Sequence, residues 1–380
     1  MNPKQSLEYL ESLQPMMLSE LLQWVEMESP TTEKSAVDRF SSLLAPELEK
    51  IGMKVETDRQ KIRGNHLVAK WSGGDRKPVL MVAHMDTVWE LGVFEKLPIR
   101  VEGNVARGPG IFDMKGGILI ALYALRLLRE HGLHHSNITL LLNSDEEEGS
   151  ESSRKLIETE ARQSQCVFIL EPAGPNNSLK TKRRGVGGYK VVAHGKAAHA
   201  GVEPGKGVNA IQELAHQILE IQSWNQLNEG ISAHVGLIHG GTRSNVIPAR
   251  AEAQVDVRCD TSEDMAWLDG KFKSLTPKNP LAKVEVTGGF DRPPLERTER
   301  VLGLYQQAQE IANAFDYPLS EYWTGGGSDG NFTAALGIPT IDGLGPEGGG
   351  AHALEEHILV SSLPRRTNLL YHMIRRRITS

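Results

Sequence analysis

The clearest candidates for chemistry are two polar side chains that end an apolar run. His84 and Asp86 follow the segment Pro78–Ala83, whose apolar character predicts a buried strand. A neutral imidazole is a common ligand of zinc, and a carboxylate behind it can fix which ring nitrogen carries the proton. The pair could instead be a polar strand end that hydrogen-bonds a loop. The segment His84-Met85-Asp86 alone leaves both the metal-site and the strand-end interpretations open.

Carboxylates also follow two further predicted strands. The strand Asn137–Asn143 runs into the acidic turn 144–149, and the strand 166–170 ends at Glu171. An acidic turn is usually a solvated surface loop. In a parallel sheet, however, the carboxyl ends of the strands share one edge, so His84 and these acids would converge there.

Glycine-rich loops supply one more acid and one more imidazole. Asp113 lies in the segment Arg107–Gly117, before the predicted helix Ile118–Leu128, and His352 lies in a later glycine-rich loop. The first loop lacks the Gly-Lys-Ser/Thr ending of a phosphate-binding loop. Asp113 could be the N-cap of the helix or a metal ligand, and the flanking glycines would let the backbone approach a ligand closely.

The composition is that of an ordinary globular protein. A chain of 380 residues is long for one hydrophobic core, so two domains are expected. The net charge of −6 gives no reason to expect nucleic acid or a membrane as a partner. We see no signal peptide and no apolar run near the ~20 residues of a membrane span. Cys166 and Cys259 are expected to be reduced and buried, which favours the cytoplasm.

The predicted elements change character after Lys180. Before it, the chain reads as an α/β domain that begins with a helix from about Ser6 to Glu28, interrupted near Pro15. After it, the order strand, helix, strand, strand, helix, strand is typical of a ferredoxin-like unit. We therefore predict a discontinuous catalytic domain, 1–184 and 291–380, and an inserted α+β domain, 185–290.

Several short motifs occur in order along nearly the whole chain. These are His84-x-Asp86, Gly-Pro-Gly-x-x-Asp113-x-Lys-Gly-Gly, Asp145-Glu146-Glu147, Leu170-Glu171-Pro172, Gly195-Lys196-x-x-His199-Ala200-Gly201 and Ala351-His352. Together they resemble the dinuclear-zinc peptidase and deacylase family, which includes glutamate carboxypeptidases, aminoacylases, and acetylornithine and succinyl-diaminopimelate deacylases. The Gly-Pro-Gly before Asp113 and the Glu at position 171 resemble the folate-cleaving glutamate carboxypeptidase branch most.

The resemblance implies a fold and a metal centre. The fold would be a phosphorylase/hydrolase-like catalytic domain with a mixed, mainly parallel sheet, plus a ferredoxin-like lid that forms a homodimer. Two Zn²⁺ per chain, replaceable by Co²⁺ or Mn²⁺, would be bridged by Asp113. His84 and Glu171 would complete one metal, and Glu147 and His352 the other.

The resemblance also implies catalytic roles. Glu146 would take a proton from the attacking water, which the metals acidify, and pass it to the leaving amine. Asp86 would hydrogen-bond the far nitrogen of His84. His199, in the lid, would donate to the developing oxyanion in the partner subunit; a turn histidine is the alternative. Met114 departs from the family, which often has Asp after the bridging Asp in a cis peptide.

Substrate-binding positions complete the prediction. Asn245 and Arg258 resemble cleft positions of the family, and Arg292 matches an arginine that holds the C-terminal carboxylate of the substrate. Arg292 could instead pair with Asp291 or Glu296 at the surface. We therefore expect a hydrolase that cleaves the amide N-terminal to an acidic amino acid in a small peptide or N-acyl amino acid. An N-acyl amino-acid deacylase and a non-catalytic dimeric binding protein are the alternatives.

Overall fold

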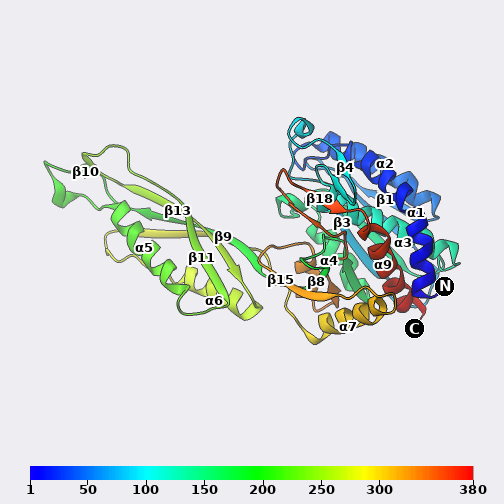
Figure 1. The fold of residues 1–380 in the computed structure, drawn as a ribbon. Helices are drawn as coiled ribbons and strands as arrows, with labels where there is room; N and C mark the ends of the chain where they lie inside the picture. Colours follow the sequence, from blue (N-terminus) through cyan, green and yellow to red (C-terminus); the bar gives the residue numbers. More distant parts are fainter. Residues whose placement is uncertain (380) are drawn as a thin grey trace. The chain divides into compact units, whose positions relative to one another are not determined.

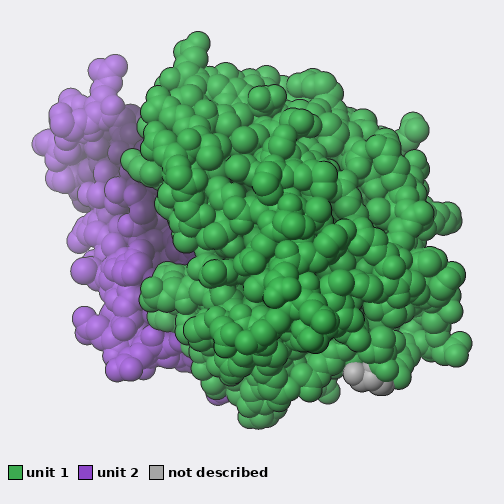
Figure 2. Space-filling model, turned by 45° about the vertical axis from the view of Figure 1, so that its right-hand side comes forward, with its two compact units in different colours: residues 1–182, 297–323, 328–380 green, residues 183–296, 324–327 purple. Residues whose placement is uncertain are grey.

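The computed structural model describes residues 1–379 and divides the chain into two compact units (Figures 1 and 2). Unit 1 comprises Met1–Lys182, Arg297–Trp323 and Ser328–Ser380, and unit 2 comprises Arg183–Glu296 and Thr324–Gly327. Each unit has its own sheet and its own hydrophobic core.

A six-stranded sheet forms the centre of unit 1. Its strands β6, β3, β7 and β16 are parallel neighbours, whereas β2 runs antiparallel to both β6 and β1. In spatial order the strands are β1 (Lys54–Asp58), β2 (His66–Trp71), β6 (Ile138–Asn143), β3 (Val79–His84), β7 (Cys166–Ile169) and β16 (Thr340–Ile341). The structure thus confirms the predicted α/β class with a mixed, mainly parallel sheet.

Helices pack against β3 and bury it completely. Leu80 and Val82 share a core cluster with Ile157 and Ala161 of α4, and both α3 and α9 also contact β3. Burial of all six residues explains why this strand is a continuous apolar run and not an alternating one. The helices of unit 1 are α1 (Pro3–Val25), α2 (Lys34–Lys50), α3 (Gly116–Glu130), α4 (Arg154–Gln163), α7 (Glu299–Asn313), α8 (Gly330–Ala335) and α9 (Ser362–Thr379).

Smaller elements complete unit 1. A four-stranded sheet has the order β17 (Gly348–Gly349), β18 (His357–Leu359), β5 (Val105–Arg107), β4 (Arg100–Glu102). The strands β8 (Ser178–Arg183) and β15 (Ser320–Thr324) pair with each other. Three short helical turns are η1 (Val93–Glu95), η2 (Ile111–Lys115) and η3 (Glu146–Glu148).

The predicted interruption of the first helix is wrong. Helix α1 continues through Pro15, although proline removes one backbone hydrogen bond. Its buried residues Leu10, Met17 and Leu21 lie on both sides of the proline, and α1 packs on α9. Tertiary packing therefore outweighs the local cost.

Unit 2 has the predicted order of strands and helices. Its antiparallel sheet has the order β11 (Ile231–Gly240), β13 (Arg250–Cys259), β9 (Gly185–His194), β14 (Lys283–Arg292). Helices α5 (Ala210–Trp224) and α6 (Ser262–Lys273) contact this sheet, and their apolar residues share its core. The short strands β10 (Ala198–His199) and β12 (Val246–Ile247) form a separate ribbon, and η4 (Pro204–Lys206) follows β10.

Two helical glycines give a matched test of the packing in unit 1. A Cβ at Gly117 would lie 2.1 Å from the carbonyl oxygen of Leu170, whereas a Cβ at Gly303 would meet nothing within 4 Å. We expect Gly117→Ala to lower the free energy of unfolding by about 1–3 kcal/mol or more. Gly303→Ala should raise it by up to ~1 kcal/mol, since alanine favours a helix. Urea denaturation measures both, and equal stability of the two variants would contradict the close packing at Gly117.

Candidate metal centre and active site

Three adjacent strand ends form one side of the candidate site. In the parallel register His84 lies opposite Asn143, and Val82 lies opposite Ile169. The chain therefore leaves β3, β6 and β7 at the same edge of the sheet. The acidic turn η3 follows β6 directly, and Glu171 follows β7 by two residues.

The turn η2 brings Asp113 to this edge. Gly110 precedes the turn with a φ of 72°, and a Cβ there would lie 2.6 Å from Cγ2 of Thr87. Only glycine allows both this conformation and this approach. The next residue after Asp113, Met114, is joined to it by a cis peptide bond and is buried. Its Sδ accepts a hydrogen bond from the backbone N–H of His84 at 3.3 Å, so a thioether fills the position where the family often has a carboxylate.

Asp113 lies between two imidazoles, one on each carboxylate oxygen. Nε2 of His84 is 3.1 Å from Oδ1 of Asp113 and 3.5 Å from Oε1 of Glu171. Nε2 of His352 is 3.4 Å from Oδ2 of Asp113 and 3.2 Å from Oε2 of Glu147. The five predicted ligands are thus brought together as two groups that share Asp113.

The two histidines differ in exposure and in how they are held. His84 is buried, and its Nδ1 lies 3.0 Å from the backbone carbonyl oxygen of Asp86, so this nitrogen donates and Nε2 faces the carboxylates. His352 is half-exposed and has a φ of 62° in the loop between β17 and β18. We expected the carboxylate of Asp86 to hold His84, but its Oδ1 is 3.6 Å away and the carbonyl is the nearer partner.

The carboxylate of Asp86 instead holds the acidic turn. Its oxygens accept backbone N–H groups of Glu146 and Glu147 at 3.3 Å each, and the hydroxyl of Thr31 at 2.7 Å. Asp86 is completely buried. It therefore fixes the backbone that carries two of the predicted functional side chains.

The crowded carboxylates shift the proton affinities of the cluster. Burial and the nearby charge of Asp113 raise the pKa of Glu147 to about 7, although its hydrogen bond to His352 opposes the shift. Hydrogen bonds to Asp113 and Glu147 raise the pKa of His352 to about 10. Burial would lower the pKa of His84, but its carboxylate partners raise it well above the ordinary value. Protons on His352 and Glu147 thus offset part of the negative charge of the clustered carboxylates, which divalent cations would offset more fully.

The side chains present fit a metal centre. His84, Asp113 and Glu147 form one group whose ligand atoms all lie within 4.8 Å of one another, and His84, Glu146 and Glu171 form another. Oε1 of Glu147 is buried and has no hydrogen-bond partner in residues 1–379. Buried polar atoms are normally paired, so this oxygen is a suitable metal ligand. Imidazole and carboxylate ligands suit zinc and related transition metals. An oxygen of Glu146 lies within 4.8 Å of ligand atoms of both His84 and Glu171.

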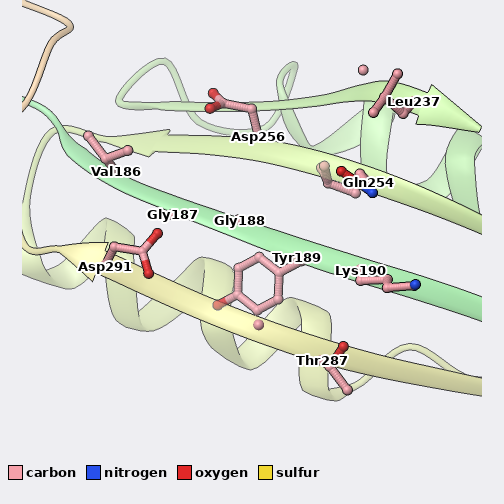
Figure 3. A pocket seen from close by; sticks show the side chains of 13 residues that line it. Val186, Gly187, Gly188, Tyr189, Lys190, Leu237, Gln254, Asp256, Thr287 and Asp291 are labelled. Carbon is pink, nitrogen blue, oxygen red and sulfur yellow. The ribbon is translucent and has the colours of Figure 1, made fainter. Parts of the chain in front are cut away.

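The two predicted arginines of unit 2 lie in one row across its sheet. Val186 of β9 pairs with Arg258 on one side and with Arg292 on the other. A hollow of about 560 Å³ on the same sheet is lined in part by Val186 and Asp256, and neither arginine is among its lining residues (Figure 3). Asp256 accepts a two-pronged hydrogen bond from Arg258 at 2.9–3.0 Å. Arg292 is buried beneath Gly327 and does not lie at the surface.

The other two predicted residues of unit 2 lie at the opposite end of its strands. His199 of β10 pairs with Val246, and the N–H of Ala200 donates to the carbonyl of Asn245 at 3.0 Å. The N–H groups of Gly201 and Val202 donate to Nδ1 of His199 at 3.2 Å each, so the proton of the neutral ring is on Nε2. The exposed Nε2–H is therefore a hydrogen-bond donor.

Residues that the sequence did not single out also contribute to the site. Thr31 reaches Asp86 from the turn after α1, and Nζ of Lys180 lies 3.8 Å from Oε2 of Glu171. Glu356 contacts the segment that carries Asp113. Neither Thr31 nor Lys180 belongs to a recognisable spacing motif, and only the position of Glu356 soon after His352 could have drawn attention.

Comparison with known proteins assigns the chain to one group. The model of "Peptidase family M20/M25/M40" matches residues 80–376. Carboxypeptidase G2 of Pseudomonas sp. (strain RS-16) is 34% identical over 372 residues, which cover 95% of this chain and 89% of that protein. Succinyl-diaminopimelate desuccinylase of Psychrobacter sp. (strain PRwf-1) is 28% identical, covering 79% of this chain and 80% of that protein.

Solved structures share the fold at low identity. Aminopeptidase PepT from Bacillus cereus has a TM-score of 0.78 and 22% identity, covering 95% of this chain and 98% of that chain. A Bacillus subtilis protein described as a dinuclear metal binding peptidase from the M20 family has a TM-score of 0.71 and 15% identity, covering 97% and 99%. Within residues 1–379, no helix combines the length and the apolar character that crossing a membrane requires.

The shared position of Asp113 predicts the metal content of the purified protein. We expect two divalent ions per chain, because each carboxylate oxygen faces a separate imidazole. Elemental analysis measures the content, and a chelator should abolish hydrolysis until metal is restored. A metal-free protein whose hydrolysis is insensitive to chelators would contradict this interpretation of the cluster.

Proposed function

This chain belongs to peptidase family M20/M25/M40, a metallopeptidase family with peptidase and deacylase members, and we propose that it is a dizinc carboxypeptidase. It would release a C-terminal, glutamate-like amino acid from a small peptide or N-acyl substrate. The observation that carries the proposal is the pair of imidazole–carboxylate groups sharing Asp113. The 34% identity to carboxypeptidase G2 favours this member of the family.

The metal ligands follow from the two groups. His84, Asp113 and Glu171 would hold one Zn²⁺, and Asp113, Glu147 and His352 the other. Both imidazoles face the carboxylates through Nε2, which is the nitrogen a metal would need. When bound, the ions would supply Lewis acidity that polarises the scissile carbonyl and lowers the pKa of the attacking water.

Glu146 is the proposed general base. Asp86 fixes its backbone through the N–H bond at 3.3 Å, and its carboxylate lies within the same cluster of ligand atoms as His84 and Glu171. From there Glu146 can take the proton of the attacking water and return it to the nitrogen of the leaving amine.

Replacing Glu146 by glutamine tests this role. The amide keeps the shape but cannot accept the proton, so turnover should fall by ~10²-fold or more while the metal content stays at the wild-type level. Glu148→Gln, on the same turn, is the control and should retain most of the activity. A Glu146→Gln enzyme with near wild-type turnover would assign the base to another residue.

Carboxylate recognition would come from the arginine row of unit 2. An arginine fork matches a carboxylate with two parallel hydrogen bonds, which lysine cannot reproduce. Arg292 is one candidate, and its buried side chain packs closely against Gly327, which limits its motion. Arg258 already holds the carboxylate of Asp256 in this way, so a substrate carboxylate would have to compete with Asp256 for it.

The role of Arg292 predicts a dependence on the free α-carboxylate. Arg292→Ala should remove ~2–4 kcal/mol of transition-state binding for a free-acid substrate, which is measured as a large fall in kcat/KM. The C-terminally amidated substrate should be poor for the wild type and hardly worse for the variant. Equal cleavage of free-acid and amidated substrates by the wild type would favour a broader amidohydrolase over a carboxypeptidase.

His199 and Asn245 would act at the active site of a partner subunit in a homodimer. His199 presents an outward Nε2–H, the donor that an oxyanion would need. The edge strand β11 exposes Leu237 and Ile238, and an open strand edge is a surface on which a second copy can pair.

A mixing experiment tests the shared site. We combine His199→Ala chains with Glu146→Gln chains and expect part of the activity to return, because one of the two sites in the hybrid dimer would be intact. The separate variants serve as controls. Hybrid dimers that form and stay inactive would place His199 in the active site of its own subunit, whereas a fully active His199→Ala homodimer would place it outside catalysis.

A deacylase that removes an acyl group from an amino acid is the second candidate function, favoured by the 28% identity to a desuccinylase. The same metals and the same base would serve it. Hydrolysis assays with aminobenzoyl-glutamate, N-acetyl amino acids and N-succinyl amino acids separate the two activities, because a carboxypeptidase would prefer the first substrate and a deacylase the others. A non-catalytic binding protein on this fold would not need a general base, so the presence of Glu146 argues against that alternative. Two free, buried cysteines, Cys166 and Cys259, support a reducing, cytoplasmic setting.

A further inference from the structure

The carboxylate of Glu356 receives an unusual set of hydrogen bonds. The residue is completely buried, and its two oxygens accept four N–H groups. Oε1 accepts the backbone N–H groups of Phe112 at 3.0 Å and Asp113 at 3.1 Å. Oε2 accepts the backbone N–H of Gly110 at 2.9 Å and the indole N–H of Trp89 at 2.7 Å.

Strand pairing places Glu356 behind the turn η2. It immediately precedes β18, whose His357 pairs with Arg107 of β5. The chain continues from β5 through Gly108, whose N–H approaches the carbonyl of Glu356 at 3.4 Å. The register of two short strands therefore sets the side chain of Glu356 against the backbone of Asp113.

These contacts connect three segments that carry functional side chains. Glu356 lies on the same loop as His352. Its donors Gly110 and Phe112 lie shortly before Asp113 in the turn η2. Its fourth donor, Trp89, lies three residues after Asp86. Because each oxygen of Glu356 has two donors, the carboxylate can neither rotate nor shift without breaking hydrogen bonds to a charged acceptor, which are stronger than those to a neutral one. No other contact described above joins all three segments.

We propose that Glu356 is a positioning residue that fixes Asp113 relative to His352 and thereby sets the affinity of the site for its metals. The inference rests on the proposed dizinc function and deepens it. Asp113 and Glu147 are both acids, and their repulsion would separate the loops before a metal arrives. Glu356 holds the turn of Asp113 from behind, so the ligands stay close without a cation.

Glutamine at position 356 tests the proposal. An amide has one acceptor oxygen, and its NH₂ group would face two N–H donors, so η2 and the His352 loop would loosen. Groups that orient metal ligands typically change metal affinity by about 10- to 100-fold. We therefore expect Glu356→Gln to bind Zn²⁺ ~10- to 100-fold more weakly, measured on apoprotein by competition with a chelator of known affinity. Visible absorption of the Co²⁺ form reports the ligand geometry independently of activity.

Two further variants make the test decisive. Glu355→Gln changes the exposed neighbour and should leave Zn²⁺ affinity unchanged. Trp89→Phe removes one of the four donors and should weaken Zn²⁺ binding by only ~3- to 10-fold. It also decides the matter if Glu356→Gln fails to fold, since unchanged affinity in Trp89→Phe would then overturn the proposal. Circular dichroism of each apoprotein checks the fold.

The outcomes separate this inference from the proposed function. Wild-type protein that binds no metal contradicts the dizinc function itself. Wild-type protein with two ions, together with a folded Glu356→Gln variant of equal Zn²⁺ affinity and an unchanged Co²⁺ spectrum, overturns the role of Glu356 alone. A lower melting temperature without weaker metal binding would likewise overturn it, because a purely structural residue would give that result.

Discussion

Electrostatic repulsion among buried carboxylates is the constraint on which the rest of the structure depends. Asp113, Glu147 and Glu171 lie around His84 with little exposure to water, where like charges repel strongly and are poorly solvated. The raised pKa values of His352 and Glu147 show that protonation of these groups relieves part of this repulsion. Such an arrangement stays folded only if the backbone holds the acids in place and if cations, protons or metals, compensate them.

The scaffold meets this constraint with two further carboxylates, which are not among the proposed metal ligands and which accept backbone N–H groups of the acidic segments. Asp86 holds the turn of Glu146 and Glu147, and Glu356 holds the turn of Asp113. Each is completely buried and is satisfied by several donors. His84 ends β3, and Glu171 follows β7 by two residues, so the sheet edge places both of these side chains.

Sequence patterns predicted what depends on local order and failed where distant contacts decide. The apolar run before His84 and the acids after β6 and β7 could be placed at one sheet edge, because parallel strands share their carboxyl ends. The interruption at Pro15 was wrong because packing on α9 is invisible in the local sequence. The carbonyl that holds His84 depends on a backbone direction that residue types do not encode, and the contacts of Glu356 depend on a strand register.

The arrangement inside unit 2 bears on how its four predicted residues could serve catalysis. Arg258 and Arg292 both pair with Val186, near the start of β9. His199 lies in β10 and Asn245 next to it, and Figure 1 shows β10 beyond the other end of the strands. Strand β13 has 10 residues, which span roughly 30 Å at ~3.3 Å per residue. A single small substrate cannot bridge that distance within one copy of unit 2. If all four residues act on substrate, the two pairs must belong to different active sites, which is the physical reason for expecting a symmetric dimer.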